Sequence, residues 1–341
     1  MAAAREQQNT GAGYWEQIAN ADFLRLSTPV SLAPLLATGI LCRYCTDVDV
    51  PYHVSIDEQT PSQQTGCISI EIEGAVQESE KTLVKARTLL ASVDTLENEA
   101  VPVWIRQTVN EFVQDKSTSS NTRPTLGIAT ADLEEGLANS TVIHGSFSGK
   151  AERTSDMITE YGDTLRSALS LRLLNASNQP REAAAEIERF LASRELPGPF
   201  ATSGGALDVL DVLSQTDPGL ALTLLCDSNN SHFAIDEWKT ESKMIHAAIR
   251  VERESVTDSI EIIASESQAV ASVARLVWLF TDAAPVVIAL NDTRIGISGV
   301  PDELIAEMAS IEFATTHTPF GYAARLAGTE EEVIEEVEAL Q

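Results

Sequence analysis

The sequence predicts an α/β protein with two domains. Its 341 residues are more than one hydrophobic core normally organises. Strand patterns and helix patterns follow one another near both ends of the chain, whereas helical patterns fill the middle. Hydrophobic residues make up 43% of the chain, which is ordinary for a folded protein.

The N-terminal part contains two predicted strands. Tyr52–Ile56 alternates between apolar and polar residues, and Cys67–Ile72 repeats this pattern. Helical periodicity predicts helices over residues 14–21, 32–45, 79–93 and 101–113.

Residues 123–150 link this part to the helical middle. Ala131–Leu137 predicts a short amphipathic helix, and Thr141–Ile143 predicts a short buried strand. A loop rich in glycine and serine, His144–Gly149, follows that strand. Loops at the carboxyl ends of strands form the ligand crevice of open α/β sheets, although a plain strand-to-helix turn explains the loop as well. The candidate phosphate-binding or nucleic-acid-binding residues of this loop are His144, Ser146, Ser148 and Gly149.

The remaining sequence predicts first a series of helices and then strands that alternate with helices. Predicted helices cover residues 154–174, 180–194, 206–213, 220–225 and 234–252. Predicted strands then cover residues 259–264, 286–290 and 293–298, and further helices cover 270–278, 302–310 and 330–340. We place the domain boundary near residues 195–235.

The charge of the chain is strongly acidic. The net charge is −28 and the sequence pI is about 4.4, and only six of the 23 basic residues are lysines. This composition indicates a halophilic archaeal protein, because high salt screens the self-repulsion of so many acids. An acidic mesophilic protein is the alternative. No basic patch, the usual footprint of nucleic-acid binding, is visible in the linear sequence.

Cysteine usage and the N-terminus favour a cytoplasmic location. Cys42 and Cys45 form a C-x-x-C pair without a second pair at zinc-finger spacing, so we expect a buried helical pair and no redox or metal site. The first residues lack the apolar core of a signal peptide, and no apolar run reaches the length of a membrane span. We therefore expect no membrane partner.

Three stretches carry a resemblance to a known family. They are Arg123–Gly149, Gly204–Asp211 with Asp217–Leu222, and Ala234–Trp238 with His246–Arg250. In this order they resemble haloarchaeal members of the RecJ-like DHH phosphoesterase superfamily. The resemblance implies a DHH-type parallel-sheet domain followed by a smaller α/β DHH-associated domain. Its implied divisions are a degenerate DHH-like domain (1–200), a helical connector (201–255) and a DHH-associated-like domain (256–341).

Active members of this family bind two divalent metals, usually manganese, through a D-x-D and an Asp-His-His motif. Two metals clamp the attacking and leaving oxygens of a phosphodiester, and carboxylates and imidazoles suit manganese. This chain departs from the pattern, because Ser27–Ser31 occupies the place of the first motif without an acid and no Asp-His-His occurs. Glu71 and Glu73 share one face of a predicted strand, but an exposed strand face explains them equally.

Further candidate residues for phosphate or nucleic acid lie in the second half. Gly204 and Gly205 precede a predicted helix whose N-terminus is suited to an anion, although Ser203 as a helix cap explains the same sequence. Arg275 and Arg294 lie where the resemblance implies nucleic-acid contacts. The alternative for both arginines is pairing with the abundant acids.

The sequence therefore predicts a catalytically degenerate RecJ-like protein that acts in DNA replication or repair as a binding or assembly factor. Expected partners are replication or repair proteins and single-stranded DNA, with no cofactor, no bound metal and no catalytic residues. One alternative is an active single-strand exonuclease or phosphoesterase that requires manganese or magnesium. Another is a regulator that binds a small ligand between the domains.

We predict that the fold depends on high salt. The Debye length falls to roughly 3 Å at about 1 M salt, so the repulsion within a chain of net charge −28 is then screened. The midpoint of thermal melting should rise steeply between dilute buffer and molar potassium chloride. A flat response would contradict the halophilic interpretation.

Overall fold

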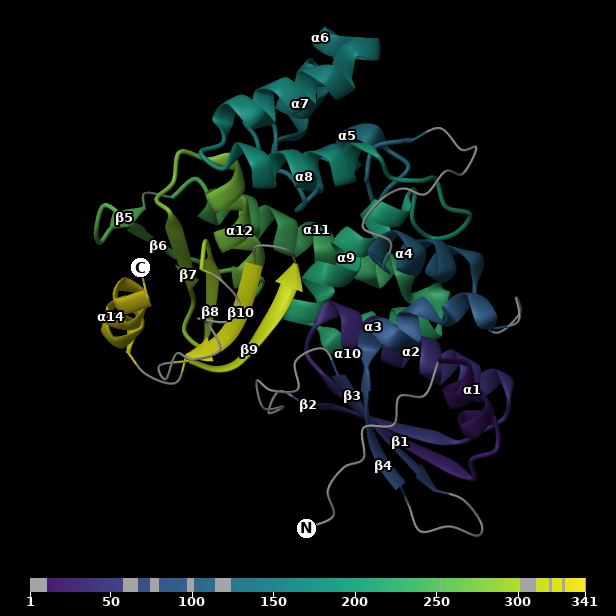
Figure 1. Cartoon of the computed structure of the whole chain (residues 1–341). Helices are drawn as coiled ribbons and strands as arrows, with labels where there is room; N and C mark the ends of the chain where they lie inside the picture. Colours follow the sequence, from purple (N-terminus) through teal and green to yellow (C-terminus); the bar gives the residue numbers. More distant parts are fainter. Residues whose placement is uncertain are drawn as a thin grey trace.

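The structure is a computed structural model that describes residues 11–57, 67–73, 80–96, 101–113, 124–251, 253–300, 311–318, 321–326 and 329–340. Two β-sheets lie in separate parts of the molecule (Figure 1). The helix α9 (Ser203–Thr216) lies between them, since it contacts α2 (Leu32–Asp47) on the side of the first sheet and β9 (Ile311–Thr318) of the second.

The first sheet has the strand order β2–β1–β3–β4. Its strands are β1 (Phe23–Pro29), β2 (Tyr52–Asp57), β3 (Cys67–Glu73) and β4 (Glu80–Lys85). β1 pairs in parallel with β2 and antiparallel with β3, and β3 pairs antiparallel with β4. Leu24 and Leu26 are buried on the side of α2 whereas Arg25 between them is exposed. One face of the sheet therefore belongs to the core.

Two strands of this sheet differ from the prediction. β1 was not predicted, and the predicted helix over residues 79–93 is wrong in its first half. Residues 80–85 form β4, and the helix α3 begins only at Ala86 (Ala86–Ala91). Val84 is buried opposite Ile68 of β3, whereas Leu83 is 39% exposed. Pairing with a neighbouring strand outweighs local helical preference here.

Helices form the middle of the chain. The helix α4 (Val103–Val113) precedes them, and α1 (Gly11–Ala19) packs against α3 near the N-terminus. The middle helices are α5 (Leu133–Asn139), α6 (Ala151–Tyr161), α7 (Leu165–Ala176), α8 (Pro180–Leu191), α9, α10 (Pro218–Cys226) and α11 (Ser231–Ala248). The predicted helix over 154–174 is broken after Tyr161, because Gly162 has a φ of 43° and ends α6.

The predicted strand Thr141–Ile143 is also wrong. These residues are largely buried, as predicted, but they form no strand. The backbone N–H of Thr141 donates to the carboxylate of Asp208 at 3.0 Å and not to a neighbouring strand. A side chain thus supplies the hydrogen bond that a sheet would otherwise provide.

The second sheet has the order β5–β6–β7–β8–β10–β9. Its other strands are β5 (Glu254–Ser255), β6 (Ile260–Ala264), β7 (Val286–Leu290), β8 (Arg294–Ser298) and β10 (Gly321–Leu326). Only β6 and β7 pair in parallel within the described sheet. β9 and β10 were not predicted, and the helix predicted over 302–310 lies outside the described residues.

Two helices cover opposite faces of this sheet (Figure 1). Val287 and Ala289 of β7 face the large core with α12 (Val270–Phe280), whereas Ile288 faces Val333 and Val337 of α14 (Glu330–Leu340). A Cβ at Gly296 of β8 would lie 2.2 Å from the Val270 carbonyl oxygen, so glycine permits the close approach of α12.

The predicted α/β class is confirmed, because both sheets contain a parallel pair and are covered by helices. The three divisions of the chain at residues 200 and 255 stay a prediction. In the part that the structure describes, no helix has the length and apolar character needed to cross a membrane.

Candidate functional site

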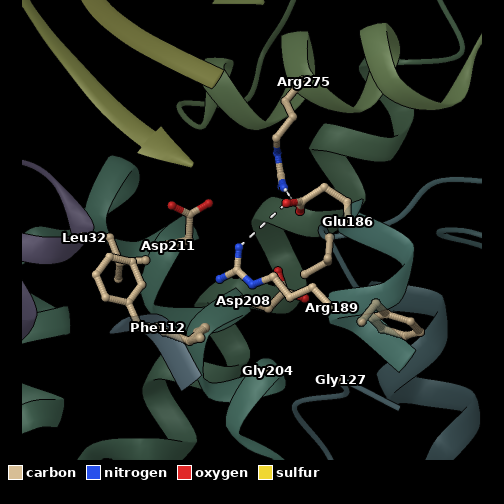
Figure 2. A pocket seen from close by; sticks show the side chains of 12 residues that line it. Leu32, Phe112, Gly127, Glu186, Arg189, Gly204, Asp208, Asp211 and Arg275 are labelled. Carbon is tan, nitrogen blue, oxygen red and sulfur yellow. Dashed lines mark hydrogen bonds and ion pairs between the residues drawn. The ribbon is translucent and has the colours of Figure 1, made fainter. Parts of the chain in front are cut away.

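A pocket opens where α8, α9 and α12 meet the first residue of α2 (Figure 2). The empty space between its lining residues measures about 490 Å³, part of which is open to solvent. Leu32, Phe112 and Phe190 supply apolar walls, and Leu32 directly follows the segment at the carboxyl end of β1. This position agrees with the rule that ligands bind beyond the carboxyl ends of strands in α/β folds.

A buried ion-pair network forms the polar wall of the pocket. Nη1 of Arg275 lies 3.1 Å from Oε2 of Glu186, and both side chains are 3% exposed. Nη1 of Arg189 lies 3.8 Å from the other oxygen of Glu186, one helical turn away on α8. Arg275 also donates to the Thr141 carbonyl oxygen at 2.7 Å. Glu186 therefore lies between two guanidinium groups, as Figure 2 shows.

Asp208 occupies the floor of this network. It accepts hydrogen bonds from both the backbone N–H and the hydroxyl of Thr141. Burial raises the pKa of Asp208, while the Thr141 hydrogen bonds and the charge of Arg275 oppose the rise. Its carboxylate is thus engaged by the protein itself.

Asp211 differs from Asp208 although it lies one turn further along α9. It is 4% exposed, and its Oδ1 has no hydrogen-bond partner. Burial raises the pKa of Asp211 to about 7, against the opposing charge of Arg275. The wall of the pocket therefore contains one buried carboxyl group that has an unbonded oxygen and a pKa near neutral.

The predicted residues Gly204 and Gly205 lie at the start of α9, and Gly204 lines the pocket. The N–H of Gly205 donates to the hydroxyl of Thr202 at 3.0 Å, and that of Gly204 donates to Ser193 at 2.7 Å. Thr202 is thus the cap, and the alternative interpretation of Ser203 as the cap is wrong. A Cβ at Gly205 would lie 2.0 Å from the Ile128 carbonyl oxygen, so packing alone requires glycine there.

Ser203 instead donates its hydroxyl hydrogen bond to Glu111 of α4. Burial raises the pKa of Glu111, and this hydrogen bond opposes the rise. The other carboxylate oxygen of Glu111 has no partner, and a Cβ at Gly204 would come within 3.1 Å of it. A second under-bonded carboxyl group thus lies beside the pocket.

The predicted loop His144–Gly149 lies against α11 and away from the pocket lining. Nδ1 of His144 lies 3.0 Å from Nδ1 of His246, and Nε2 of His246 lies 3.0 Å from the Ser140 carbonyl oxygen. Since a carbonyl only accepts, His246 carries its proton on Nε2 and His144 donates from Nδ1. Burial lowers the pKa of His144 to about 4 and that of His246 to about 3.

The other predicted residues are placed as follows. Ser146 and Gly149 are exposed, and the hydroxyl of Ser148 accepts a hydrogen bond from the N–H of Gly145 at 3.1 Å. Arg294 is half-buried and donates to the Gln215 carbonyl oxygen. Arg275 is bound to Glu186 and Thr141, and its predicted contact with phosphate stays a prediction.

The residues named for metal and redox chemistry are scattered. Cys42 and Cys45 are both buried on α2, as predicted. Glu71 of β3 lies in register with Arg25 of β1. Within the described residues, no three His, Cys, Asp or Glu side chains lie close enough together to hold a metal ion.

Sequence reasoning missed Glu186, Arg189, Asp208 and Asp211. A signal was present in α9, where Leu207–Asp211 carries two acids three residues apart in an otherwise apolar helix. Acids at buried helix positions require partners. Thr141, which bonds Asp208, and Arg275, whose charge lies near both acids, are distant in sequence and become visible only in the fold.

No family model matches the chain. An uncharacterised protein of Haloarcula marismortui is 25% identical over 316 residues, which cover 84% of this chain and 83% of that relative.

The solved structures similar to this chain include CDC45 from Entamoeba histolytica, with a TM-score of 0.49, 8% identity and coverage of 97% of this chain and 98% of CDC45. RecJ from Thermus thermophilus in complex with Mn²⁺ gives a TM-score of 0.40 and 12% identity, over 99% of this chain and 55% of RecJ. An exonuclease RecJ bound to manganese gives a TM-score of 0.37 and 13% identity, over 97% of this chain and 92% of that protein. TM-scores at this level do not carry an argument about function.

We predict that Arg275→Leu destabilises the protein by about 3 kcal/mol or more, because Glu186 then loses its closest counter-charge inside the protein. Urea unfolding at fixed high salt measures the loss. The matched control is Arg172→Leu, since the Arg172–Glu160 pair is largely exposed and its removal should cost less than about 1 kcal/mol. Equal losses in the two variants would contradict the structural role of the buried pair.

We also predict an acid sensitivity that originates in the His144–His246 pair. The folded pKa of each histidine lies below the unfolded value of about 6.5, so the unfolded chain binds more protons in acid. The pair therefore contributes full stability above pH ~6.5 and loses it as the pH falls through about 4.

The variant His144→Gln keeps a donor for His246 but removes one titrating group. Between about pH 7.5 and pH 5, its unfolding free energy should fall by about 2 kcal/mol less than that of the wild type. Buried acids such as Asp211 titrate with the opposite sign, and their contribution cancels in this difference. Parallel pH profiles of the two proteins would refute the assignment.

Proposed function

We propose that the protein is a RecJ-like binding or assembly factor of DNA replication or repair that does not hydrolyse phosphodiesters. The sequence resemblance supports the RecJ-like character. The segment Ser27–Ser31 at the end of β1 supports the lack of hydrolysis, because it offers no acid where active members carry their first metal ligands. We also propose that the protein is cytoplasmic and halophilic.

The observation that carries the proposal is the state of the carboxylates in the pocket. A pair of manganese ions needs several carboxylate or imidazole groups with free lone pairs. Glu186 is engaged by Arg275 and Arg189, and Asp208 by Thr141. The described residues of the pocket therefore do not fit a two-metal centre, and we derive no chemical step through one.

The partners that suit this proposal are replication or repair proteins and single-stranded DNA. An active exonuclease with rearranged ligands remains the alternative that a direct assay addresses.

One observation favours a second function, the binding of a small ligand. Asp211 offers an unpartnered oxygen inside the pocket, and Nε of Arg275 is a buried donor without a partner in the same pocket. A ligand that both donates and accepts hydrogen bonds would satisfy the two groups, while the aromatic walls hold its apolar part.

We predict that the purified protein releases no nucleotides from single-stranded DNA in the presence of manganese and molar potassium chloride. Elemental analysis of the same preparation should find much less than one manganese per chain. Manganese-dependent hydrolysis that is lost in Asp211→Asn, but not in the exposed control Asp236→Asn, would overturn the proposal and establish the enzyme.

A further inference from the structure

Three cationic side chains gather around the loop His144–Gly149. Lys150 ends the loop, Arg153 lies on the first turn of α6, and Arg250 follows the last turn of α11. Arg153 and Arg250 are exposed, and Lys150 is partly exposed. We call these three residues the cation cluster.

Backbone carbonyl groups of the loop hold the two arginines. Arg250 donates through Nη2 to the Ser148 carbonyl oxygen, and Arg153 donates through Nη1 to that of Ser146 at 3.5 Å. Each guanidinium keeps further N–H donors that bond nothing else in the described residues. The loop thus positions both groups while leaving donors for a ligand.

Gly149 permits this arrangement. Its φ is 66°, a left-handed conformation that favours glycine. A Cβ at this position would lie 3.1 Å from the Cβ of His246 and 3.5 Å from both terminal nitrogens of Arg250. A side chain at residue 149 would therefore press on the guanidinium that lies over the loop.

The cation cluster is unusual for the charge of this chain. Acids outnumber lysines and arginines by 51 to 23. Five described cations have acid partners, namely Arg172, Arg189, Lys239, Arg253 and Arg275. Others, such as Arg43 and Arg166, donate to backbone carbonyl groups elsewhere in the chain. Within the described part of the chain, none of the three clustered cations forms an ion pair, although Glu152 and Asp156 lie on the same helix as Arg153.

The three cations repel one another, and this repulsion lowers the pKa of Lys150 and that of Arg250. The charge of Arg250 is the largest cause that lowers the pKa of Lys150, and Arg153 adds to it. Arg153 also lowers the pKa of Arg250, after the effect of burial. An anion placed among the three would relieve this repulsion.

We propose that the cation cluster binds a phosphate group. Planar guanidinium groups donate pairs of hydrogen bonds to phosphate oxygens, and an ammonium adds a point charge. The exposed Ser146 lies in the same loop and offers a hydroxyl donor. The phosphate is that of a nucleic-acid backbone or of a free phosphate compound. In the first case the site rests on the proposed function and supplies its contact with single-stranded DNA.

The test uses the full-length protein with all three cations replaced, Lys150→Gln, Arg153→Gln and Arg250→Gln. Binding of a fluorescent oligothymidylate is measured by anisotropy over a series of potassium chloride concentrations. The variant should bind at least about tenfold more weakly than the wild type. The slope of log K against log salt should flatten by about 0.7, since this is what one phosphate contact with a single strand contributes.

The matched control replaces three exposed cations elsewhere, Arg172→Gln, Arg181→Gln and Lys243→Gln. This control changes the net charge equally and should bind like the wild type. Equal weakening in both triple variants, or wild-type binding in the cluster variant, overturns the site. Absence of binding to every phosphate probe by the wild type overturns it as well.

Two further probes distinguish the source of the phosphate. If inorganic phosphate and pyrophosphate compete with the oligonucleotide and raise the melting temperature, the site takes free phosphate groups. If only the oligonucleotide binds, the site takes a phosphodiester backbone. Hydrolysis of the oligonucleotide is followed separately with manganese, so failure of the proposed function is distinguishable from failure of the site.

Discussion

The buried ion pair between Glu186 and Arg275 is the interaction on which the centre of the molecule depends. It joins α8, in the helical middle, to α12, which covers the second sheet. Arg275 also binds the Thr141 carbonyl oxygen, and the N–H of Thr141 binds Asp208 on α9. Three helices are thus tied through one short non-helical segment. Loss of either charge would leave the other buried and unpaired, which is costly.

The same network determines the electrostatics of the pocket. Two guanidinium groups face three carboxyl groups, so the full charge of the third carboxylate has no counterpart. Asp211, which lacks a partner for Oδ1, is the one whose pKa rises to about 7. The carboxyl group most available to a ligand is therefore the one whose charge varies near neutral pH. A ligand that donates a hydrogen bond would favour its ionised form.

The spacing of apolar residues correctly predicted those helices and strands in which the apolar residues alone form the buried face. α2, β2 and the strands β6–β8 are of this kind. The predictions failed where a distant partner decides the conformation, as in β4, which pairs with β3, and in Thr141–Ile143, which Asp208 holds. The residues of the pocket likewise divide into those that the sequence indicated and those that only the fold reveals. Gly204 and Arg275 were selected from the sequence and do line the pocket, but the acids beside them lie in helices whose partners are remote in sequence.

Salt acts on the cation cluster in two opposite directions. A chain of net charge −28 repels a nucleic acid at long range, and this repulsion weakens as the Debye length shrinks toward roughly 3 Å at about 1 M. Direct contacts of Lys150, Arg153 and Arg250 with phosphate weaken at the same time, because counterion release becomes less favourable. At high salt, the long-range attraction between a positively charged surface and a nucleic acid is screened. A compact group of donors fixed by loop carbonyls retains its directional hydrogen bonds. Such a site is therefore suited to phosphate recognition on an acidic surface.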